Sequence, residues 1–222
     1  MNSEAASWAE LLLNAPKNWR KKQMDLWTIE NELYDGGMDG YICGVDEAGR
    51  GPLAGPVCAA AVILPRGIEI AGLNDSKKLS AKKREALFDE IIKQAVAYGI
   101  AYASEKEIDE INILNATFTA MNRAISQLEQ KPVLALVDGN TVKGIEMQAR
   151  NVVGGDGKSA SIAAASILAK VSRDRLMLEM AEKYPEYSFE KHKGYGTKVH
   201  YAALREYGPS PIHRLTFLKK MH

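Results

Sequence analysis

The chain has 222 residues, of which 46% are hydrophobic and 26% are charged, with 29 Lys and Arg against 28 Asp and Glu. This composition is ordinary for a globular protein and excludes wholesale disorder, a collagen-like repeat and a disulfide scaffold. A formal net charge of +1, taken alone, argues against a protein that coats nucleic acid, because such proteins carry a strong positive excess.

The cysteines and the apolar runs bear on the compartment. Cys43 and Cys58 each lie in an apolar stretch, which is typical of reduced, buried thiols in a cytosolic protein. The N-terminus has no positively charged start before its short apolar run and does not resemble a signal peptide. The longest apolar run, residues 57–64, is too short to span a bilayer. We expect a cytoplasmic protein with no membrane contact.

The first 38 residues predict a short helical accessory segment. Apolar residues at helical spacing indicate one or two short helices, around residues 8–13 and 24–33. The Gly- and Asp-rich stretch 34–40 then predicts a loop or linker. The expected organisation is an accessory segment over 1–38, a core over 39–190 and a basic helical part over 191–222.

Strand and helix patterns alternate along the rest of the chain. Apolar runs predict strands over residues 41–45, 57–64, 100–103, 132–137 and 147–153, the last at a sheet edge. Helical spacing predicts helices that begin after Ser80 and stop at Gly99, and over residues 104–130, 159–184 and 197–207. This alternation indicates an α/β layered fold.

The character of the strands predicts a mixed sheet. The runs over 41–45 and 132–137 are continuously apolar, as in parallel strands buried on both faces. The run over 57–64 follows the first strand too closely for a helix to intervene, so that pair is predicted to be antiparallel.

Carboxylates lie at the ends of two of these strands. Asp46 and Glu47 follow the first strand, and Asp138 follows the fourth. In open α/β sheets, ligands bind outside the carboxyl ends of parallel strands. Carboxylates gathered there repel one another, and hard divalent cations such as Mg²⁺ or Mn²⁺ remove that repulsion. The alternative is that these aspartates only favour turns. Asp156, ahead of a helix, is either a helix-capping residue or a third acidic site residue.

Two glycine-rich segments imitate nucleotide-binding motifs. Residues 49–54 fit the spacing of a dinucleotide fingerprint, but Pro52 and an apolar strand follow where that motif requires a helix. Residues 157–159 end like a phosphate-binding loop, but Val152 stands where the loop needs glycine. Neither segment supports a nucleotide-binding enzyme.

Five motifs in order resemble those of the ribonuclease HII family. They are GVDEAGRGPLAGPV at 44–57, NDSKKLS at 74–80, VDG at 137–139, GDGK at 155–158 with SIAAASILAKVSRD at 161–174, and HKGYGTKVH at 192–200. The resemblance extends over about residues 41–217, and five ordered motifs are far more specific than one.

The resemblance implies a fold, a reaction and a metal site. The fold is ribonuclease H-like, a mixed five-stranded sheet flanked by helices with a helical C-terminal part. The enzyme cuts the RNA strand of RNA–DNA hybrids and nicks 5′ of a ribonucleotide embedded in duplex DNA, which leaves 3′-hydroxyl and 5′-phosphate ends. Two Mn²⁺ or Mg²⁺ ions are expected on the acidic residues Asp46, Glu47, Asp138 and Asp156.

The resemblance also implies substrate-binding residues. The loop Gly49-Arg50-Gly51 corresponds to the family loop whose backbone contacts the ribose 2′-hydroxyl, and Tyr195 to the tyrosine that packs on the neighbouring sugar. The alternatives are a tight turn joining two strands, which is compatible with the contact to the ribose, and a partly buried core tyrosine. Phosphate contacts are expected from three lysines, which are otherwise solvated: Lys77, Lys78 and Lys158. His192, His200 and His213 have no zinc-site spacing and are expected at the surface or in the core.

Two other functions compete with this one, and the distribution of charge bears on the choice. A ribonuclease HIII, with a larger N-terminal domain and glutamate at the fourth acidic position, fits the short leader and Asp156 poorly. A non-catalytic hybrid-binding module is the alternative outside the enzymes. Residues 191–222 hold seven basic residues and one acid, a net charge of +6, which leaves −5 on the rest. We therefore expect an acidic metal site beside a basic part that holds a duplex, in a monomer.

Overall fold

The computed structural model describes residues 26–219, which contain a five-stranded sheet in the order β3-β2-β1-β4-β5. The strands are β1 (Tyr41–Ala48), β2 (Val57–Ile63), β3 (Ala97–Ala103), β4 (Pro132–Asp138) and β5 (Ala149–Val152). β1 pairs antiparallel with β2 and parallel with β4, and β5 lies at an edge. The predicted mixed sheet is therefore confirmed.

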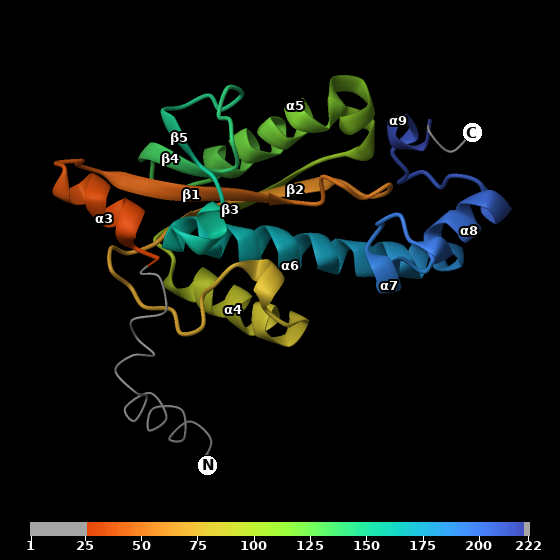
Figure 1. Ribbon diagram of the computed structural model, residues 1–222, viewed down its shortest axis with the longest axis horizontal. Coiled ribbons are helices and arrows are strands. Elements are labelled where there is room, and N and C mark those ends of the chain that lie inside the picture. Colours follow the sequence, from red (N-terminus) through yellow and green to blue (C-terminus); the bar gives the residue numbers. More distant parts are fainter. Residues whose placement is uncertain (1–25, 220–222) are drawn as a thin grey trace, which may run out of the picture.

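Helices cover both faces of this sheet (Figure 1). α5 (Glu105–Ser126) lies on one face, and α6 (Ala160–Lys183) lies on the other with α4 (Ala81–Gln94) outside it. α3 (Thr28–Asp35) lies at one end of the molecule, and α7 (Phe189–His192), α8 (Lys198–Tyr207) and α9 (Leu215–Leu218) lie at the opposite end. The remaining helical segments are single 3₁₀ turns: η1 (Ser76–Lys78), η2 (Gly155–Gly157) and η3 (Pro185–Tyr187).

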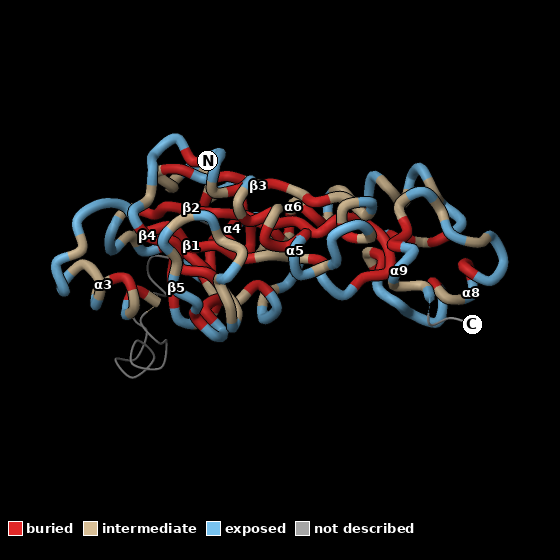
Figure 2. The backbone as a smooth tube through the Cα atoms, turned by 90° about the horizontal axis from the view of Figure 1, so that it is seen from above, coloured by how far each residue is buried: buried red, intermediate tan, exposed pale blue. Residues whose placement is uncertain are grey.

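Small residues in the central strands let the helices approach closely. A Cβ at Gly44 in β1 would lie 2.1 Å from the backbone of Ser161, so α6 sits directly against this strand only because position 44 is glycine. Every residue of β2 is buried, and its run of alanines at 59–61 leaves room for a helix on each face. Figure 2 shows the resulting core as a continuous buried band through the sheet and α6.

Side chains cap the starts of four helices, among them the one at Ser80 that the sequence predicts. The side chains of Ser80, Ser104, Ser159 and Thr197 accept hydrogen bonds from backbone N–H groups in the first turns of α4, α5, α6 and α8. Ser104 forms a full capping box with Glu107. These caps fix where each helix begins, including the start of α6 beside the predicted site.

Two predicted boundaries are wrong. Gly99 does not end α4, which stops at Gln94, but lies inside β3, where a Cβ would come within 2.1 Å of the Ala124 carbonyl oxygen of α5. The glycine is therefore needed for helix–sheet packing. β1 does not end at Val45 but continues to Ala48, because its pairing with β2 extends to Cys58, so Asp46 and Glu47 lie within the strand.

α5 is interrupted, although its sequence pattern predicts a continuous helix. Asn112 has φ 66° and ψ 163°, outside the helical region. Its side-chain oxygen accepts hydrogen bonds from the N–H groups of Leu114 and Asn115, at 3.0 and 3.1 Å, and so caps the second part of the helix. The apolar residues have helical spacing both before and after Asn112, so the sequence pattern does not reveal the interruption.

The described part of the N-terminal segment docks on α6. Glu30 of α3 is 1% exposed and accepts hydrogen bonds from the Ser159 hydroxyl (2.6 Å) and the Ser161 N–H (3.1 Å) at the start of α6. The helix predicted around residues 8–13 lies outside the described residues, and the division at residues 38 and 190 stays a prediction. Within residues 26–219, no helix is long and apolar enough to cross a membrane.

Candidate functional site

Three aspartates from three elements meet at the carboxyl end of the parallel strands. Asp46 of β1, Asp138 of β4 and Asp156 of η2 each offer a carboxylate oxygen, and these oxygens lie within 4.8 Å of one another. The last paired residues of the two strands are Val45 and Val137, directly before Asp46 and Asp138. Parallel pairing therefore brings the two strand carboxylates together, as the sequence predicts.

A glycine turn adds the third carboxylate. Gly154 has the left-handed conformation at φ 64°, which turns the chain after β5 into η2. The Gly155 N–H then donates to Asp138 Oδ1 at 2.7 Å, so the loop that carries Asp156 is fastened to β4. Asp156 is buried and precedes the Ser159 cap rather than supplying it. Its predicted alternative role as the cap of α6 is therefore wrong.

Burial and mutual repulsion disfavour the ionised form of this cluster. Asp46 is 4% exposed, and burial together with the charges of Glu47 and Asp138 raises its pKa well above the ordinary value. Burial and the nearby Asp75 also raise the pKa of Asp156. The Glu47 N–H donates to Asp46 Oδ1 at 2.7 Å, which offsets only part of this cost. The cluster therefore lacks the positive charge that would balance it.

Glu47, the fourth predicted acid, lies outside the mutual 4.8 Å of the trio. Successive residues of a strand face opposite sides of the sheet, which separates Glu47 from Asp46. Arg50 Nη1 lies 3.4 Å from Glu47 Oε1, and burial nevertheless raises the pKa of this carboxyl group. The structure thus brings three of the four predicted acids together, and Glu47 lies outside this group.

The three predicted lysines have different positions. Lys77 Nζ lies 3.4 Å from Asp156 Oδ2, and although burial acts to lower its pKa, the Asp156 charge raises it overall. Lys78 Nζ lies 3.7 Å from Asp75 Oδ2. Lys158 is exposed and donates to the Val153 carbonyl at 2.6 Å. Only Lys77 contacts the carboxylate trio.

The loop 49–51 and Tyr195 lie side by side. A Cβ at Gly51 would be 3.6 Å from Tyr195 Cε1, which places the tyrosine ring against the loop. Gly49 has φ 95°, a conformation that favours glycine, and a Cβ there would collide with the Arg173 side chain. Tyr195 is 45% exposed, so its predicted alternative as a core tyrosine is wrong. The loop that follows β1 and the Tyr195 ring therefore lie against each other.

Several residues around this surface are missed by sequence reasoning. Arg173 and Arg214 are fully buried and donate hydrogen bonds to the loop after β1. Ser76 and Ser166 share a hydrogen bond of 2.7 Å, and the Ser166 hydroxyl acts against the raised pKa of Asp46. The signal in the sequence is that Ser76 lies inside the second motif and that Ser166 and Arg173 lie inside the fourth.

The three histidines are buried and packed together. The rings of His192 and His200 stack with centroids 4.5 Å apart, and His200 Nε2 lies 2.9 Å from His213 Nε2. Burial lowers the pKa of all three, that of His213 to about 4. His200 Nδ1 hydrogen-bonds to the Tyr195 carbonyl at 3.0 Å. The alternative of core histidines is confirmed, and these three support the loop that carries Tyr195.

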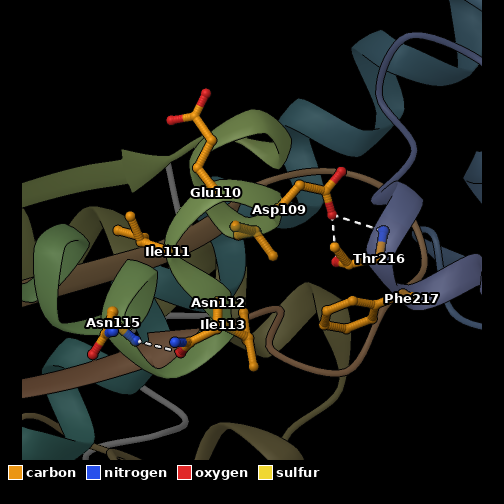
Figure 3. Close-up of a pocket in the computed structure, with 9 residues that line it drawn as sticks. Asp109, Glu110, Ile111, Asn112, Ile113, Asn115, Thr216 and Phe217 are labelled. Atoms are coloured by element: carbon orange, nitrogen blue, oxygen red, sulfur yellow. Dashed lines mark hydrogen bonds between the residues drawn. The ribbon is translucent and has the colours of Figure 1, made fainter.

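A separate pocket of about 550 Å³ lies between the start of α5 and α9 (Figure 3). Asp109 of α5 accepts hydrogen bonds there from the N–H groups of Leu215 (2.8 Å) and Thr216 (2.9 Å) and from the Thr216 hydroxyl. None of the predicted site residues lines it. Its contacts attach α9 to α5 and thereby fix the segment that precedes α9.

The donor set of the trio fits a divalent cation. Carboxylate oxygens are hard ligands of the kind that Mg²⁺ and Mn²⁺ bind, and three within 4.8 Å can share one or two ions. Burial first, and then neighbouring carboxylates, raise the pKa of Asp46 and Asp156, and a bound cation would act in the opposite direction.

Comparisons with known proteins identify the family of this chain. Residues 43–221 match the family model of ribonuclease HII. A ribonuclease HII from Caldicellulosiruptor bescii is 58% identical over 87% of this chain and 93% of its own length. Another, from Clostridioides difficile, is 54% identical over 92% of this chain and 81% of its own length.

Solved structures show the same fold. The ribonuclease H2 of Pyrococcus horikoshii has a TM-score of 0.67 and 31% identity over 79% of this chain and 93% of its own. An RNase HII solved in complex with PCNA, from Archaeoglobus fulgidus, has a TM-score of 0.63 and 27% identity over 79% of this chain and 94% of the other. The predicted ribonuclease H-like fold is therefore confirmed. Ribonucleases HII are endonucleolytic hydrolases that degrade the RNA of RNA–DNA hybrids, and this chain belongs to the ribonuclease HII family.

Proposed function

We propose that the enzyme hydrolyses the RNA strand of RNA–DNA hybrids and also nicks 5′ of single ribonucleotides embedded in duplex DNA, leaving 3′-hydroxyl and 5′-phosphate ends. The observation that carries the proposal is the trio Asp46, Asp138 and Asp156, of which the first and last are buried, beside a glycine-rich loop whose Arg50 and Gly51 are exposed. The trio supplies the chemistry, and the loop supplies the selection of ribose.

The acids would hold Mn²⁺ or Mg²⁺. Asp46, Asp138 and Asp156 form the core of the ligand set, with Glu47 at the rim. When bound, two such ions activate water for attack and neutralise the charge that develops on the phosphate and the leaving oxygen. The chain itself holds Asp138 in place through the Gly155 N–H and keeps Lys77 near Asp156. Lys77 thereby balances part of the negative charge of the cluster.

Selection of ribose would rest on the loop Gly49-Arg50-Gly51 and on Tyr195. The 2′-hydroxyl is the group by which proteins distinguish RNA from DNA. The glycines let the backbone approach the sugar, where a Cβ would collide. Tyr195 offers an aromatic face, which accommodates the adjoining deoxyribose because that sugar has no 2′-hydroxyl to satisfy. The contact between Gly51 and the Tyr195 ring supports placing both around one junction.

The duplex would be held through its phosphates. Lys77, Lys78 and Lys158 are exposed, as are Lys191 and Lys198 of the basic C-terminal part. Such contacts position a duplex without reading its sequence. We propose that residues 39–190 form the catalytic core, that 191–222 complete the substrate cleft and that 1–38 are accessory. The enzyme would act as a monomer in the cytoplasm, in removal of ribonucleotides during DNA replication and repair.

The test uses a duplex DNA that contains one ribonucleotide. With Mg²⁺ or Mn²⁺ we expect a single nick 5′ of the ribonucleotide, with a 5′-phosphate on the downstream product, and no product after addition of a chelator. The same duplex without the ribonucleotide is the control and should stay intact. Metal-independent binding without nicking would overturn the proposal in favour of a hybrid-binding module.

A further inference from the structure

Two buried arginines converge on the loop after β1. Arg173 of α6 is 1% exposed and Arg214, directly ahead of α9, is 0% exposed. Within residues 26–219 neither forms an ion pair. Burial lowers the pKa of both groups, that of Arg214 to about 9. Arginine side chains nevertheless keep their positive charge in folded proteins. A buried charge without a carboxylate partner is costly, which calls for a functional reason.

All six hydrogen bonds that the two guanidinium groups donate go to backbone carbonyls. Arg214 donates to the carbonyl oxygens of Gly49 (2.6 Å), Arg50 (2.9 Å) and Gly55 (2.8 Å). Arg173 holds those of Pro56 (3.0 Å), Ala54 (3.1 Å) and Lys193 (3.1 Å). The planar, forked guanidinium is suited to fixing several acceptors at once, whereas a lysine ammonium is a single point charge.

The hydrogen bonds from Arg214 determine the direction of the Arg50 and Gly51 N–H groups. In a trans peptide the carbonyl and the following N–H point in opposite directions, and no described peptide is cis. With the Gly49 and Arg50 carbonyls turned inward to Arg214, the N–H groups of Arg50 and Gly51 point the other way. Both residues are exposed, and neither N–H has a hydrogen-bond partner among the described residues.

The residue beside Arg214 supports the other side of the same surface. His213 Nε2 lies 2.9 Å from His200 Nε2, and His200 Nδ1 hydrogen-bonds to the Tyr195 carbonyl. The Arg214 N–H donates to the Leu53 carbonyl at 2.9 Å, and Asp109 fixes the residues that follow (Figure 3). The dipeptide His213-Arg214 therefore joins the loop 49–51 to the loop that carries Tyr195.

We propose that Arg214 is a positioning residue for recognition of the ribose. It orients the Gly49 and Arg50 peptides so that the N–H groups of Arg50 and Gly51 donate to the 2′-hydroxyl oxygen of the ribonucleotide. This inference rests on the proposed function and adds a residue that touches no substrate. It predicts that loss of the guanidinium fork removes selection of ribose and leaves general duplex binding intact.

The experiment measures the dissociation constants of two matched duplexes, one with a single ribonucleotide and one of DNA alone, with Ca²⁺ in place of Mg²⁺. Wild type should prefer the ribonucleotide. In Arg214→Lys this preference should fall about tenfold, because one or two hydrogen bonds to the 2′-hydroxyl are lost. Binding of the DNA duplex should be unchanged. Arg205→Lys, at an exposed arginine of α8, is the matched control and should keep the preference.

Retention of the full preference by a folded Arg214→Lys protein would overturn the inference. Circular dichroism checks the fold, and Arg214→Gln, which removes the buried charge and two of the three donors, serves as a second variant with the same expectation. Failure of both variants to fold would make Arg214 a requirement for folding and would also overturn its role in recognition. Wild-type protein that neither prefers nor nicks the ribonucleotide would instead contradict the proposed function.

Discussion

The acidic site contains clustered negative charges, whereas the loop region beside it contains buried positive charges. At the sheet end, three carboxylates lie within 4.8 Å of one another, and burial and repulsion raise the pKa of Asp46 and Asp156. A few residues away, two buried guanidinium groups are surrounded by neutral backbone carbonyls, and three buried imidazoles have lowered pKa values. The first region gathers negative charge that a divalent cation would offset, whereas the buried guanidinium groups of the second are hydrogen-bonded within the chain.

We attribute phosphodiester hydrolysis to the acidic site and recognition of ribose to the loop region. The acids sit on regular strands and a short turn, where small shifts would change the ligand geometry. The loops that we propose to face the sugar are held by side chains from α6 and the C-terminal part. We therefore expect changes in the first region to abolish catalysis, and changes in the second to alter substrate preference or stability.

The largest effect should come from Asp138→Asn. An amide keeps an oxygen that can accept the Gly155 N–H but loses the charge that a cation requires, so cleavage should fall by about 10³-fold or more with the fold intact. Initial rates on the single-ribonucleotide duplex measure this. Asp39→Asn, at an exposed aspartate away from the trio, should leave the rate unchanged. Retained turnover of Asp138→Asn at saturating Mg²⁺ would remove Asp138 from the mechanism.

Tyr195→Ala should act on selection rather than on chemistry. Loss of the aromatic face should reduce cleavage at a single embedded ribonucleotide by about tenfold, which corresponds to about 1.4 kcal/mol of lost transition-state stabilisation. Long hybrids, which present many alternative sites, should lose less. Tyr207→Ala, at an exposed tyrosine of α8, is the control. Equal losses on the two substrates would assign Tyr195 to general binding.

The histidine cluster should make stability depend on pH. The pKa of His213 is about 4 in the folded protein, against an ordinary value of 6.5. The unfolded chain therefore binds more protons between these values, and the stabilisation present above pH 6.5 is lost as the pH falls toward 4, with a loss of about 2 kcal/mol at pH 5.

Thermal unfolding at pH 7 and pH 5 measures this dependence. The carboxyl groups of raised pKa act in the opposite sense, so the test compares wild type with His213→Gln. The drop in Tm on acidification should be smaller in the variant by about 4–8 °C. The same drop in both proteins would show that His213 does not titrate over this range.

The smallest effect concerns long-range charge. Replacing Lys191, Lys193 and Lys198 with Gln should weaken duplex binding modestly and reduce the slope of log K against log salt by about 0.9 for each phosphate that is no longer neutralised. Titrations from 50 to 200 mM salt measure the slope. The exposed lysines Lys82, Lys83 and Lys93 of α4 provide a control triple variant, which should keep the slope. An unchanged slope in the first variant would show that these three lysines do not contact the phosphates of the duplex.

The sequence predicts the first region better than the second for a physical reason. Strand periodicity and the carboxylates that follow two apolar runs are local signals, and parallel pairing of β1 with β4 then brings Asp46 and Asp138 together. Ser159 and the other helix caps are local signals as well. Asp156 is close in sequence to α6, and so its place in the trio follows from the start of that helix.

The second region depends on contacts between residues far apart in the chain. Arg214 donates to Gly49, 165 positions earlier, and nothing in the composition around either residue marks the pair. His192, His200 and His213 have no ligand-like spacing, yet the turns around α7 and α8 pack them together. The break at Asn112 and the packing role of Gly99 are likewise set by tertiary contacts that override local pattern.

The central claim is that the carboxylate cluster is destabilised until a divalent cation occupies it, and Asp46→Asn tests it most directly. Without metal, the variant should melt about 3–6 °C above wild type, because it removes a buried charge that repels its neighbours. Added Mn²⁺ should raise the Tm of wild type and leave that of the variant nearly unchanged. A metal-free variant less stable than wild type, with an equal response to Mn²⁺, would contradict the account.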